Sequence, residues 1–541
     1  MRKMTRICSL LLTLTFLITI LSAQNHMDLV TTITGDFYGA LMGFSVVSLD
    51  FNGDGITDLA VQEANWNPTG IYDGFQRYGR INFYWGGTGF DNTPDFFING
   101  SADLLFETAY SEIINAGDVN NDGIEDLAVT SKSGSILKLV IYFGRVTPIS
   151  IPDIVISFPT DYPSGYSSFS IKKLGDINDD TYDDIGLSMV GADDQTRKIK
   201  IMLGGNFNLI DLYNIESNNS MMITGVGDVN SDGVSDYHIK YPLFGTDYLQ
   251  NRLSVHFGSN TFPDLDSVVI CPNTNSYVQD YAAALGDVNG DGIDDFTSYI
   301  YENAKVWFGG PNLSTQWDVQ LTEGVYTTRG EIVSHGDFNN DGYEDLVGSS
   351  AGYAFDTGIA WVWLGGSNFN GTVDLVIPAQ PGVFENFGFA KATGDFNNDG
   401  FCDMAISQPY SEGGALATPG KVFIFAGNEQ LQDTTVANSD FSNLTPDKAL
   451  WGITVYPNPI PQGKYTLSIH FSGVGYSKTV GNLKAILYNI KGQKIDSSSI
   501  PGANIRSKSW TYTFKKYPNG EYVIEILDKN CRLTSKKFTI K

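Results

Sequence analysis

The chain carries one nine-residue acidic pattern seven times, and this repetition limits the folds that it can adopt. The pattern is Asp-x-Asn-x-Asp-Gly-x-x-Asp, as in the segment from Asp50 to Asp58. Successive copies begin 50–68 residues apart. Six full copies begin at Asp50, Asp118, Asp228, Asp287, Asp337 and Asp395, and a seventh, beginning at Asp176, has Thr181 in place of the glycine. Self-similarity at this period indicates an array of equivalent structural units.

The spacing of oxygen-bearing residues within each copy suits a calcium ion. Side-chain oxygens at positions 1, 3, 5 and 9, with the backbone carbonyl of position 7, can surround a hard cation that prefers about six to eight oxygen ligands. Glycine at position 6 permits the sharp turn that directs these oxygens inward, so Thr181 should strain its loop. Plain surface turns are the alternative, but they explain one copy more easily than seven. We expect calcium as the cofactor, with up to seven Ca²⁺ per chain.

The predicted metal ligands occupy the same five positions in every loop. They are Asp50, Asn52, Asp54, Ile56 and Asp58; Asp118, Asn120, Asp122, Ile124 and Asp126; Asp176, Asn178, Asp180, Tyr182 and Asp184; Asp228, Asn230, Asp232, Val234 and Asp236; Asp287, Asn289, Asp291, Ile293 and Asp295; Asp337, Asn339, Asp341, Tyr343 and Asp345; and Asp395, Asn397, Asp399, Phe401 and Asp403. The seventh position contributes its carbonyl, so its side chain is free to be apolar.

The residues after each loop predict a strand rather than the second helix of an EF-hand. An EF-hand needs Glu at position 12, which is Val61 in the first loop, Val129 in the second and Gly348 in the sixth. Strand-like runs such as residues 59–61 and 127–129 follow instead. Each loop is therefore predicted to form the tip of a β-hairpin, with its apolar positions packed into a core.

A second element recurs between the loops and completes the unit. It is a run of alternating aromatic and aliphatic residues that usually ends in glycine. It occurs at residues 81–87, 139–144, 199–205, 253–258, 305–310, 360–366 and 421–427. Units of about 50–70 residues with about four short strands each are typical of propeller blades. The predicted fold is all-β, a seven-bladed β-propeller followed by a small C-terminal β-sandwich.

The start of the mature chain predicts how the ring of blades closes. Residues 28–30 read Asp-Leu-Val, as do strand-like segments that follow the aromatic run inside the array, such as residues 374–376. We therefore predict that residues 28–34 form the outer strand of the last blade, beside residues 421–427.

These motifs together resemble FG-GAP (VCBS-type) repeats, as in the β-propeller of integrin α chains. The resemblance rests on the acidic loops, the aromatic-Gly strands, and the segments Gly43-Phe44-Ser45 and Gly388-Phe389-Ala390. It covers about residues 28–427 and implies a seven-bladed propeller whose loops bind calcium. The chain departs from the pattern at Thr181 and at Leu49, where the other copies have Gly before the loop.

Charge divides the chain into three parts. Arg2, Lys3 and Arg6 precede an apolar run, which predicts a cleaved signal peptide over residues 1–23; a membrane anchor is the alternative, but the run is short. Residues 25–450 hold 17 Lys and Arg against 57 Asp and Glu, whereas residues 451–541 hold 14 against 4. The acidic part excludes nucleic acid as a partner, because binding to phosphates needs a basic surface. We expect no membrane-spanning segment in the mature chain.

The third part predicts a route of export. We assign residues 24–427 to the propeller, 428–450 to a polar linker and 451–541 to a C-terminal domain. Segments such as 455–459, 487–493 and 518–524 resemble, in order, the sorting domain of proteins exported by the type IX secretion system of Bacteroidetes-like bacteria. The resemblance implies that the secretion machinery is a partner, and that the protein is secreted or held on the outer surface of a Gram-negative bacterium. An immunoglobulin-like adhesive module remains the alternative.

The connections opposite the loops are candidates for ligand binding. Residues 62–80 and 407–420 are long connections in the first and last blades, which are neighbours in a closed ring. Their aromatic residues suit stacking on sugars or burial in a protein interface, unless they pack onto their own blades. The candidates are Trp66, Tyr72, Phe75, Tyr78 and Tyr410.

The sequence favours a binding protein over an enzyme. We find no nucleophile elbow, zinc-binding helix or phosphate loop, so no catalytic residue is assigned. The predicted function is a calcium-binding adhesion or ligand-binding module whose partner is an extracellular glycan or protein. The alternative is a carbohydrate-active enzyme, or its substrate-binding component, that uses the same face. Carboxylates, or a Tyr, His and Arg group, converging in the central pocket would favour the enzyme.

Overall fold

The structure is a computed structural model that describes most of the chain from residue 26 onward. The described residues are 26–432 and the strands between 452 and 540. Outside the description lie residues 1–25, 71–76, 108–110, 134–135, 160–165, 192, 194–195, 217–219, 243–250, 264–266, 272–277, 301–302, 323–331, 353–357, 380–385, 411–418, 433–451, 457–465, 473–482, 490–493, 501–508, 514–519, 529–530 and 541. The predicted signal peptide therefore lies outside the described residues.

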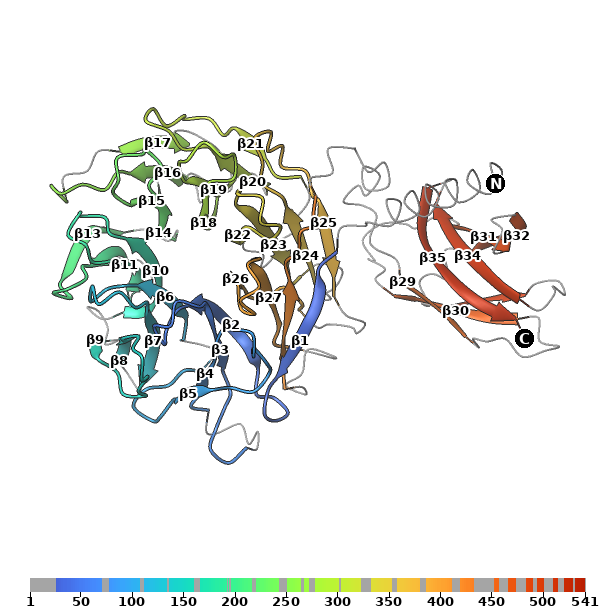
Figure 1. The fold of residues 1–541 in the computed structure, drawn as a ribbon, viewed down its shortest axis with the longest axis horizontal. Helices are drawn as coiled ribbons and strands as arrows, with labels where there is room; N and C mark the ends of the chain where they lie inside the picture. The colour runs from blue at the N-terminus through green and yellow to red at the C-terminus, as the bar shows by residue number, and fades with distance from the viewer. Residues whose placement is uncertain are drawn as a thin grey trace, which may run out of the picture. The chain divides into compact units, whose positions relative to one another are not determined.

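Seven four-stranded antiparallel sheets form a ring of blades, as predicted (Figure 1). The first four blades are consecutive in the chain. They are β2 (Met42–Leu49), β3 (Asp58–Glu63), β4 (Arg80–Tyr84) and β5 (Phe96–Asn99); β6 (Ile113–Gly117), β7 (Asp126–Ser133), β8 (Ile136–Tyr142) and β9 (Ile154–Pro159); β10 (Tyr166–Gly175), β11 (Asp184–Gly191), β12 (Thr196–Met202) and β13 (Leu209–Glu216); and β14 (Met222–Gly227), β15 (Asp236–Pro242), β16 (Asn251–His256) and β17 (Ser267–Cys271).

The remaining blades follow the same order, except that the last one is completed by the start of the chain. They are β18 (Val278–Gly286), β19 (Asp295–Ile300), β20 (Asn303–Trp307) and β21 (Val319–Gln320); β22 (Ile332–Gly336), β23 (Asp345–Ser350), β24 (Ile359–Trp363) and β25 (Leu375–Pro378); and β26 (Lys391–Gly394), β27 (Asp403–Gln408), β28 (Lys421–Ala426) and β1 (Asp28–Thr34). The first strand of each blade lies innermost and leads into an acidic loop.

Strand β1 closes the ring, which confirms the sequence prediction. It pairs antiparallel with β28, with Asp28 opposite Ala426 and Thr34 opposite Lys421. Figure 1 shows β1, at the blue end of the chain, beside the orange strands of the last blade. Because the first and last segments of the propeller share one sheet, backbone pairing in blade 7 holds the two ends of the ring together.

The hydrophobic core lies between neighbouring blades. One cluster, for example, joins Val46 and Leu59 of blade 1 to Ala405 and Ile424 of blade 7. The second loop position contributes to this core in every blade, and all seven residues are fully buried: Phe51, Val119, Ile177, Val229, Val288, Phe338 and Phe396. Burying such a side chain contributes about 1.5–3 kcal/mol, so each loop is anchored by the interface next to it.

The C-terminal part is also built from β-strands. One sheet contains β29 (Gly452–Tyr456), β30 (Thr466–Ser472) and β33 (Ser509–Thr513). The other contains β32 (Lys494–Ile500), β31 (Leu483–Asn489), β34 (Gly520–Asp528) and β35 (Cys531–Ile540). The chain divides into two compact units, the first of which ends at Asp433.

Candidate functional site

The seven acidic loops lie at one end of the blades, each between the first and second strand. In every loop the first-position carboxylate accepts at least two backbone N–H groups of its own loop, those of the fifth and sixth positions. Asp50 Oδ1 accepts from the nitrogen of Asp54 at 3.2 Å, and Asp50 Oδ2 accepts from the nitrogen of Gly55 at 2.8 Å. The bond to the sixth-position nitrogen recurs in all seven loops at 2.7–2.9 Å. The loops therefore share one backbone conformation.

This conformation needs a left-handed residue at the sixth position. The glycines there have φ between 82° and 91°, and Thr181 has a φ of 76°. An added Cβ at the sixth-position glycines meets nothing within 4 Å, so side-chain space is available. The energetic cost at Thr181 therefore comes from its left-handed backbone conformation, which β-branched residues rarely adopt. This is the strain that the sequence predicted.

The ninth-position aspartate ties each loop to the third strand of its blade. All seven of these side chains are fully buried. One oxygen accepts from the nitrogen of the second position at 2.9–3.2 Å. The other accepts at 2.7–3.2 Å from the glycine that follows the third strand.

The same contact explains why the aromatic strands end in glycine. A Cβ on Gly86 would lie 2.3 Å from the carbonyl oxygen of Thr57, and a Cβ on Gly144 would lie 2.2 Å from that of Glu125. Both distances are far below any real contact, so the backbone approaches the loop closely only where no side chain is present. The acidic loop and the glycine at the end of the aromatic strand thus recur together because they contact each other.

Burial makes the ninth-position carboxylates costly to ionise. It raises the pKa of Asp58, Asp184, Asp236, Asp295 and Asp403 to about 7, and that of Asp126 and Asp345 to about 8. Bonds from backbone N–H groups oppose this shift, and the other aspartates of the loop reinforce it. At neutral pH each loop therefore gains stability from a nearby positive charge.

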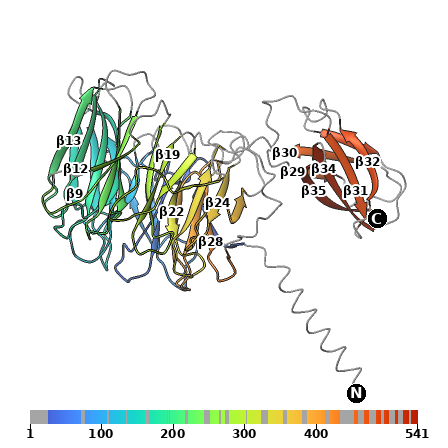
Figure 2. The same ribbon diagram turned by 90° about the horizontal axis from the view of Figure 1, so that it is seen from above.

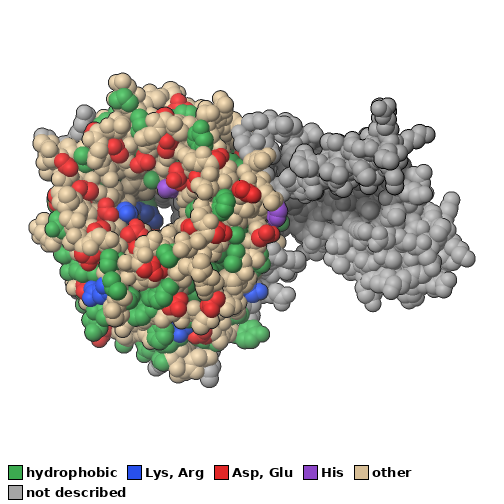
Figure 3. Space-filling view, in the orientation of Figure 1, with side chains coloured by type: hydrophobic (Ala, Val, Ile, Leu, Met, Phe, Trp, Pro, Cys, Tyr) green, Lys and Arg blue, Asp and Glu red, His purple; other side chains and the backbone are tan. Residues whose placement is uncertain are grey.

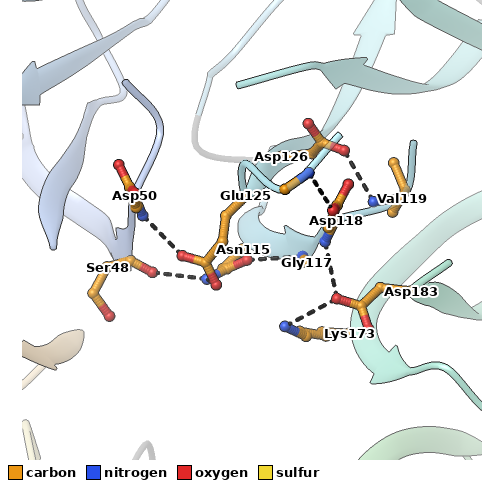
Figure 4. Close-up of polar contacts among 11 residues, drawn as sticks. Ser48, Asp50, Asn115, Gly117, Asp118, Val119, Glu125, Asp126, Lys173 and Asp183 are labelled. Atoms are coloured by element: carbon orange, nitrogen blue, oxygen red, sulfur yellow. Dashed lines mark hydrogen bonds and ion pairs between the residues drawn. The ribbon is translucent and has the colours of Figure 1, made fainter. Parts of the chain in front are cut away.

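A side-chain contact links the loops of neighbouring blades at three of the blade interfaces, and the sequence did not reveal it. The eighth-position side chain of one blade accepts a hydrogen bond from the loop of the preceding blade. Glu125 accepts from the nitrogen of Asp50 at 2.8 Å, and Asp183 accepts from that of Asp118 at 2.9 Å (Figure 4). Asp294 and Asp228 form the same pair at 3.0 Å. The loops thus help to hold neighbouring blades together.

The chemistry of the loops fits calcium. Each loop offers three carboxylates and an Asn oxygen, which are the hard ligands that this ion prefers. In the described part of the chain, no ion pair to Lys, Arg or His involves the first, fifth or ninth position. As the side chains lie, no three His, Cys, Asp or Glu residues among those described gather tightly enough to hold a metal. Their oxygens accept the N–H groups of the loop instead.

The opposite end of the blades holds the predicted ligand-binding aromatics. Trp66 is half-buried beneath Arg80, whose guanidinium carbon lies 5.0 Å from the ring centroid. Arg80 also pairs with the buried Glu63 at 2.8 Å and with Asp36. Burial raises the pKa of Glu63, and the charge of Arg80 opposes this shift. Trp66 therefore lies against a charged cluster of Arg80 and Glu63 from its own blade and Asp36 from the segment that joins β1 to β2.

Two of the other four predicted aromatic residues lie in the described part of the chain. Tyr78 is half-buried, and its backbone nitrogen donates to the carbonyl of Trp66 at 3.0 Å. Tyr410 meets Phe389 edge to face, with ring centroids 5.7 Å apart. Tyr72 and Phe75 lie outside the described residues.

A second aromatic group spans the junction of blades 1 and 7. Phe389 contacts Phe44 with ring centroids 5.2 Å apart, in addition to Tyr410. Phe44 lies near the start of β2 and Phe389 just before β26, so both are at the ends away from the loops. Sequence reasoning used them only as marks of the repeat, although their equivalent positions in neighbouring blades could have shown that they meet.

An axial channel of about 450 Å³ runs between the innermost strands. Its described lining includes Lys172, Lys173 and Lys391, with Glu112 and His335. Figure 3 shows basic side chains in blue inside the central opening, while acidic side chains in red surround it.

Comparison with known proteins finds matches to the propeller and to the C-terminal part. Residues 329–363 match the FG-GAP repeat, and residues 454–541 match the secretion system C-terminal sorting domain. With the fold, these matches define an FG-GAP repeat β-propeller, related to integrin α chains, that carries a C-terminal sorting domain. The sorting domain implies interaction with a secretion machinery.

Curated relatives match only over part of their length. Integrin alpha-V of Gallus gallus is 29% identical over 217 residues, which cover 37% of this chain and 19% of the integrin. Phosphatidylinositol-glycan-specific phospholipase D of Rattus norvegicus is 32% identical over 162 residues, or 26% of this chain and 19% of the phospholipase. The match to the solved structure of the Dos1 propeller covers 74% of this chain and 95% of that chain at 9% identity, with a TM-score of 0.39.

Proposed function

We propose that this protein is a secreted, calcium-binding propeller that acts as an adhesion or ligand-binding module. The observation that carries the calcium part is the set of seven loops, whose first-, fifth- and ninth-position carboxylates have no basic partner among the described residues. The resemblance to integrin α propellers supports the same reading.

The loop residues would hold calcium through the oxygens predicted from the sequence. Positions 1, 3, 5 and 9 would supply side-chain oxygens, and position 7 its carbonyl. A bound calcium ion supplies the positive charge that the buried ninth-position carboxylate lacks. The Asp residues at that position meanwhile keep the third strand against the loop. Calcium would thus stabilise the blade as well as the loop.

The face opposite the loops would bind the ligand. It carries the pair of aromatic groups around Arg80 and Phe389, at the junction where the chain ends close the ring. Aromatic rings stack on sugars and fill pockets in protein partners, so an extracellular glycan or protein is the proposed ligand.

We propose a binding role without catalysis. Glycoside hydrolysis usually needs two carboxylates that face each other across the substrate. The described lining of the channel holds one, Glu112, whose two oxygens accept from Lys172 at 2.6 Å and from the nitrogen of Ile171 at 3.1 Å. This arrangement supports a structural role for Glu112 over that of an acid or base.

We further propose that the protein acts outside the cell, either released or attached to the surface of a Gram-negative bacterium. The sorting domain at residues 454–541 supports this location. In the described part of the chain, no helix has the length and apolar character needed to span a membrane.

The test is a binding screen of the full chain against glycans and matrix proteins, with calcium or with chelator. Binding should require calcium and should fall in Tyr410→Ala and Trp66→Ala. Trp317→Ala is the matched control, because Trp317 is an exposed aromatic that packs on Lys305 in another blade. Equal loss in all three variants, or binding unchanged in Tyr410→Ala and Trp66→Ala, would contradict the proposed face. Melting temperatures of the variants separate loss of binding from loss of folding.

A further inference from the structure

The interface between blades 3 and 4 holds a group of polar aromatic side chains. These blades are neighbours in the ring (Figure 1), and their apolar contact includes Ile201 and Ile239. Tyr213, Tyr237 and Tyr241 lie in the same interface. The three tyrosines are not predicted calcium ligands, and they are not part of the described channel lining. They therefore belong to neither of the sites described above.

These tyrosines form a continuous row of contacts with a histidine and an arginine. Tyr237 stacks on His256 with ring centroids 5.3 Å apart, and Tyr213 meets the same imidazole edge to face at 6.5 Å. Tyr213 also stacks on Tyr241 at 6.1 Å. The guanidinium carbon of Arg252 lies 5.8 Å from the centroid of the Tyr241 ring. Tyr237 and His256 are buried, whereas the other three side chains are partly exposed.

Arg252 occupies the position in its blade that Arg80 occupies in blade 1. Each arginine pairs across the strands with the residue five positions after the ninth-position aspartate, which is Glu63 for Arg80 and Tyr241 for Arg252. The carboxylate of Glu63 neutralises Arg80. The guanidinium of Arg252 forms no ion pair or hydrogen bond with any described residue. Blade 4 thus has an arginine whose charge the described residues do not neutralise.

Several polar atoms of this row also lack partners. The hydroxyl of Tyr237, Nδ1 of His256 and Nε of Arg252 are buried, and none has a hydrogen-bond partner among the described residues. The other imidazole nitrogen, Nε2, shares a hydrogen bond of 2.8 Å with the hydroxyl of Ser254. Folded proteins leave few buried polar atoms unpaired, because each one destabilises the fold. Three of them in one row indicate a role other than packing.

The charge present in this row is positive. Burial raises the pKa of Tyr213, Tyr241 reinforces the shift, and the positive charge of Arg252 opposes it. No carboxylate of the described residues contributes to this shift. Burial lowers the pKa of His256 to about 4, so its imidazole is neutral at pH 7. A negatively charged ligand would therefore meet Arg252 without competition from a described aspartate or glutamate.

From these contacts we propose that Tyr213, Tyr241 and Arg252 form a binding site for a carboxylate carried on a sugar ring, as in a uronic acid residue of an acidic glycan. A guanidinium binds a carboxylate through two parallel hydrogen bonds. Aromatic rings pack against the apolar faces of sugars. An acidic protein side chain offers the same carboxylate but no ring to pack on the tyrosines, so the glycan is the better match.

The site lies in other blades than the aromatic groups at Trp66 and Tyr410, and it uses none of the predicted calcium ligands. Binding of a uronic acid can therefore be found or excluded whatever the outcome of the tests of the proposed function.

The experiment is a calorimetric titration of the full chain with a trisaccharide that ends in glucuronate, and with the methyl ester of the same trisaccharide. We expect the acid to bind at least about tenfold more tightly than the ester, because the ester lacks the charge that Arg252 recognises. Arg252→Gln should remove this preference. Arg252→Lys should restore only part of it, because an ammonium group lacks the planar fork.

Two further variants separate charge from packing. Tyr213→Leu should weaken the acid and the ester alike by about fivefold, because it removes a ring that packs on the sugar. Arg145→Gln is the matched control, since Arg145 is neutralised by Asp153 at 2.6 Å in blade 2. It should bind the acid like the unmodified chain. Melting temperatures of all variants distinguish loss of binding from loss of folding.

Several results would overturn the proposal. They are no binding of the acid, equal binding of acid and ester, an unchanged preference in Arg252→Gln, or equal loss in Arg145→Gln. A glutamate-rich peptide that binds as tightly as the acid would overturn the assignment to a sugar. Asp247 is the acidic residue nearest to Arg252 in the sequence and lies outside the described residues. Unchanged binding in Asp247→Asn supports the proposal, whereas tighter binding would show that the chain supplies its own carboxylate to Arg252 and would contradict it.

Discussion

The two ends of the propeller blades differ in how far their contacts repeat from blade to blade. At the loop end, the same residues make the same contacts seven times, down to the bond between the ninth-position aspartate and the glycine after the third strand. At the other end, the contacts differ between blade 1, where Arg80 covers Trp66, and blade 7, where Tyr410 packs on Phe389. Repetition marks the part that holds the ring together, and variation marks the part that is free to recognise a ligand. Figure 2 shows the propeller blades from the side.

Removing calcium should affect the whole molecule, although the metal binds at one end. Extracellular calcium sites often have dissociation constants of about 10⁻⁴–10⁻³ M, so millimolar calcium contributes roughly 1 kcal/mol per site and up to about 10 kcal/mol for seven. We expect chelator to lower the melting temperature by up to about ten degrees, because the unfolding entropy of a domain this large is about 0.8 kcal/mol/K. Magnesium at the same concentration is the control for general ionic effects. A melting temperature that chelator leaves unchanged would contradict the claim that calcium bound at the loop end stabilises the propeller.

The pH dependence of stability should reverse when calcium is removed. Burial raises the pKa of the seven ninth-position carboxyls to about 7 or 8, so the metal-free folded chain binds more protons than the unfolded chain between about pH 4 and 8. Stability of the metal-free protein is therefore greatest near the acid end of this range and is lost as pH rises through 7, by about 1.4 kcal/mol per unit of pKa shift for each group.

Two buried histidines act in the opposite direction. Burial lowers the pKa of His238 to about 3 and that of His256 to about 4, so acidification below about pH 6.5 favours the unfolded chain at these residues. Seven carboxyls outnumber two imidazoles, so the net trend without metal should follow the carboxyls. With calcium, protons compete with the metal and acid should destabilise. Denaturant unfolding at pH 5, 6, 7 and 8, with and without chelator, measures both trends, and parallel curves would contradict the account.

Substitutions within one loop should separate structural from metal-binding carboxylates. Asp126→Asn removes an acceptor from a buried pair of N–H bonds, to Val119 and Gly144, and should cost about 2–3 kcal/mol even in chelator. Asp122→Asn changes an exposed side chain and should matter only when calcium is present. Urea unfolding of both variants in calcium and in chelator tests this contrast. Equal effects in the two conditions for Asp122→Asn would show that its carboxylate does not serve the metal.

The smallest effect should come from the one irregular loop. Thr181→Gly relieves a left-handed β-branched residue and should stabilise the chain by about 1 kcal/mol, even though it removes the 2.7 Å bond from Asn121 to the Thr181 hydroxyl. The reverse change in a regular loop, Gly123→Thr, should destabilise by a similar amount. Thermal unfolding measures both effects. A loss of stability in Thr181→Gly would show that the hydrogen bond from Asn121 stabilises the chain by more than the backbone strain at Thr181 destabilises it.

The sequence predicted what repeats and missed what depends on neighbouring blades. The loops, the aromatic strands and the closure by β1 could be predicted because each leaves a pattern along the chain. The bond from the Asp50 nitrogen to the Glu125 carboxylate could not be predicted, because it joins residues 75 positions apart that meet only once the blades are packed. The position of Trp66 beneath Arg80 likewise depends on Asp36, which arrives through ring closure.

Two lysines that line the axial channel could be predicted in part. Lys172 and Lys391 share the same offset from their loops, so aligning the repeats would have placed them at one level. Their place beside the axis follows only from the fold, in which β10 and β26 are the innermost strands of their sheets. Patterns along the chain thus give equivalence between blades, and the fold gives the point toward which the equivalent residues converge.

The most direct test of the account is the number of calcium ions that the purified chain holds. Elemental analysis after dialysis against calcium, combined with calorimetric titration of the chelator-treated protein, should find six to seven ions per chain, with the loop at Asp176 as the weakest site. Substituting Asp50, Asp118 or Asp395 singly by Asn should lower the count by one each. A chain that holds no calcium at millimolar concentration, or whose count ignores these substitutions, would contradict the claim that the seven loops are metal sites.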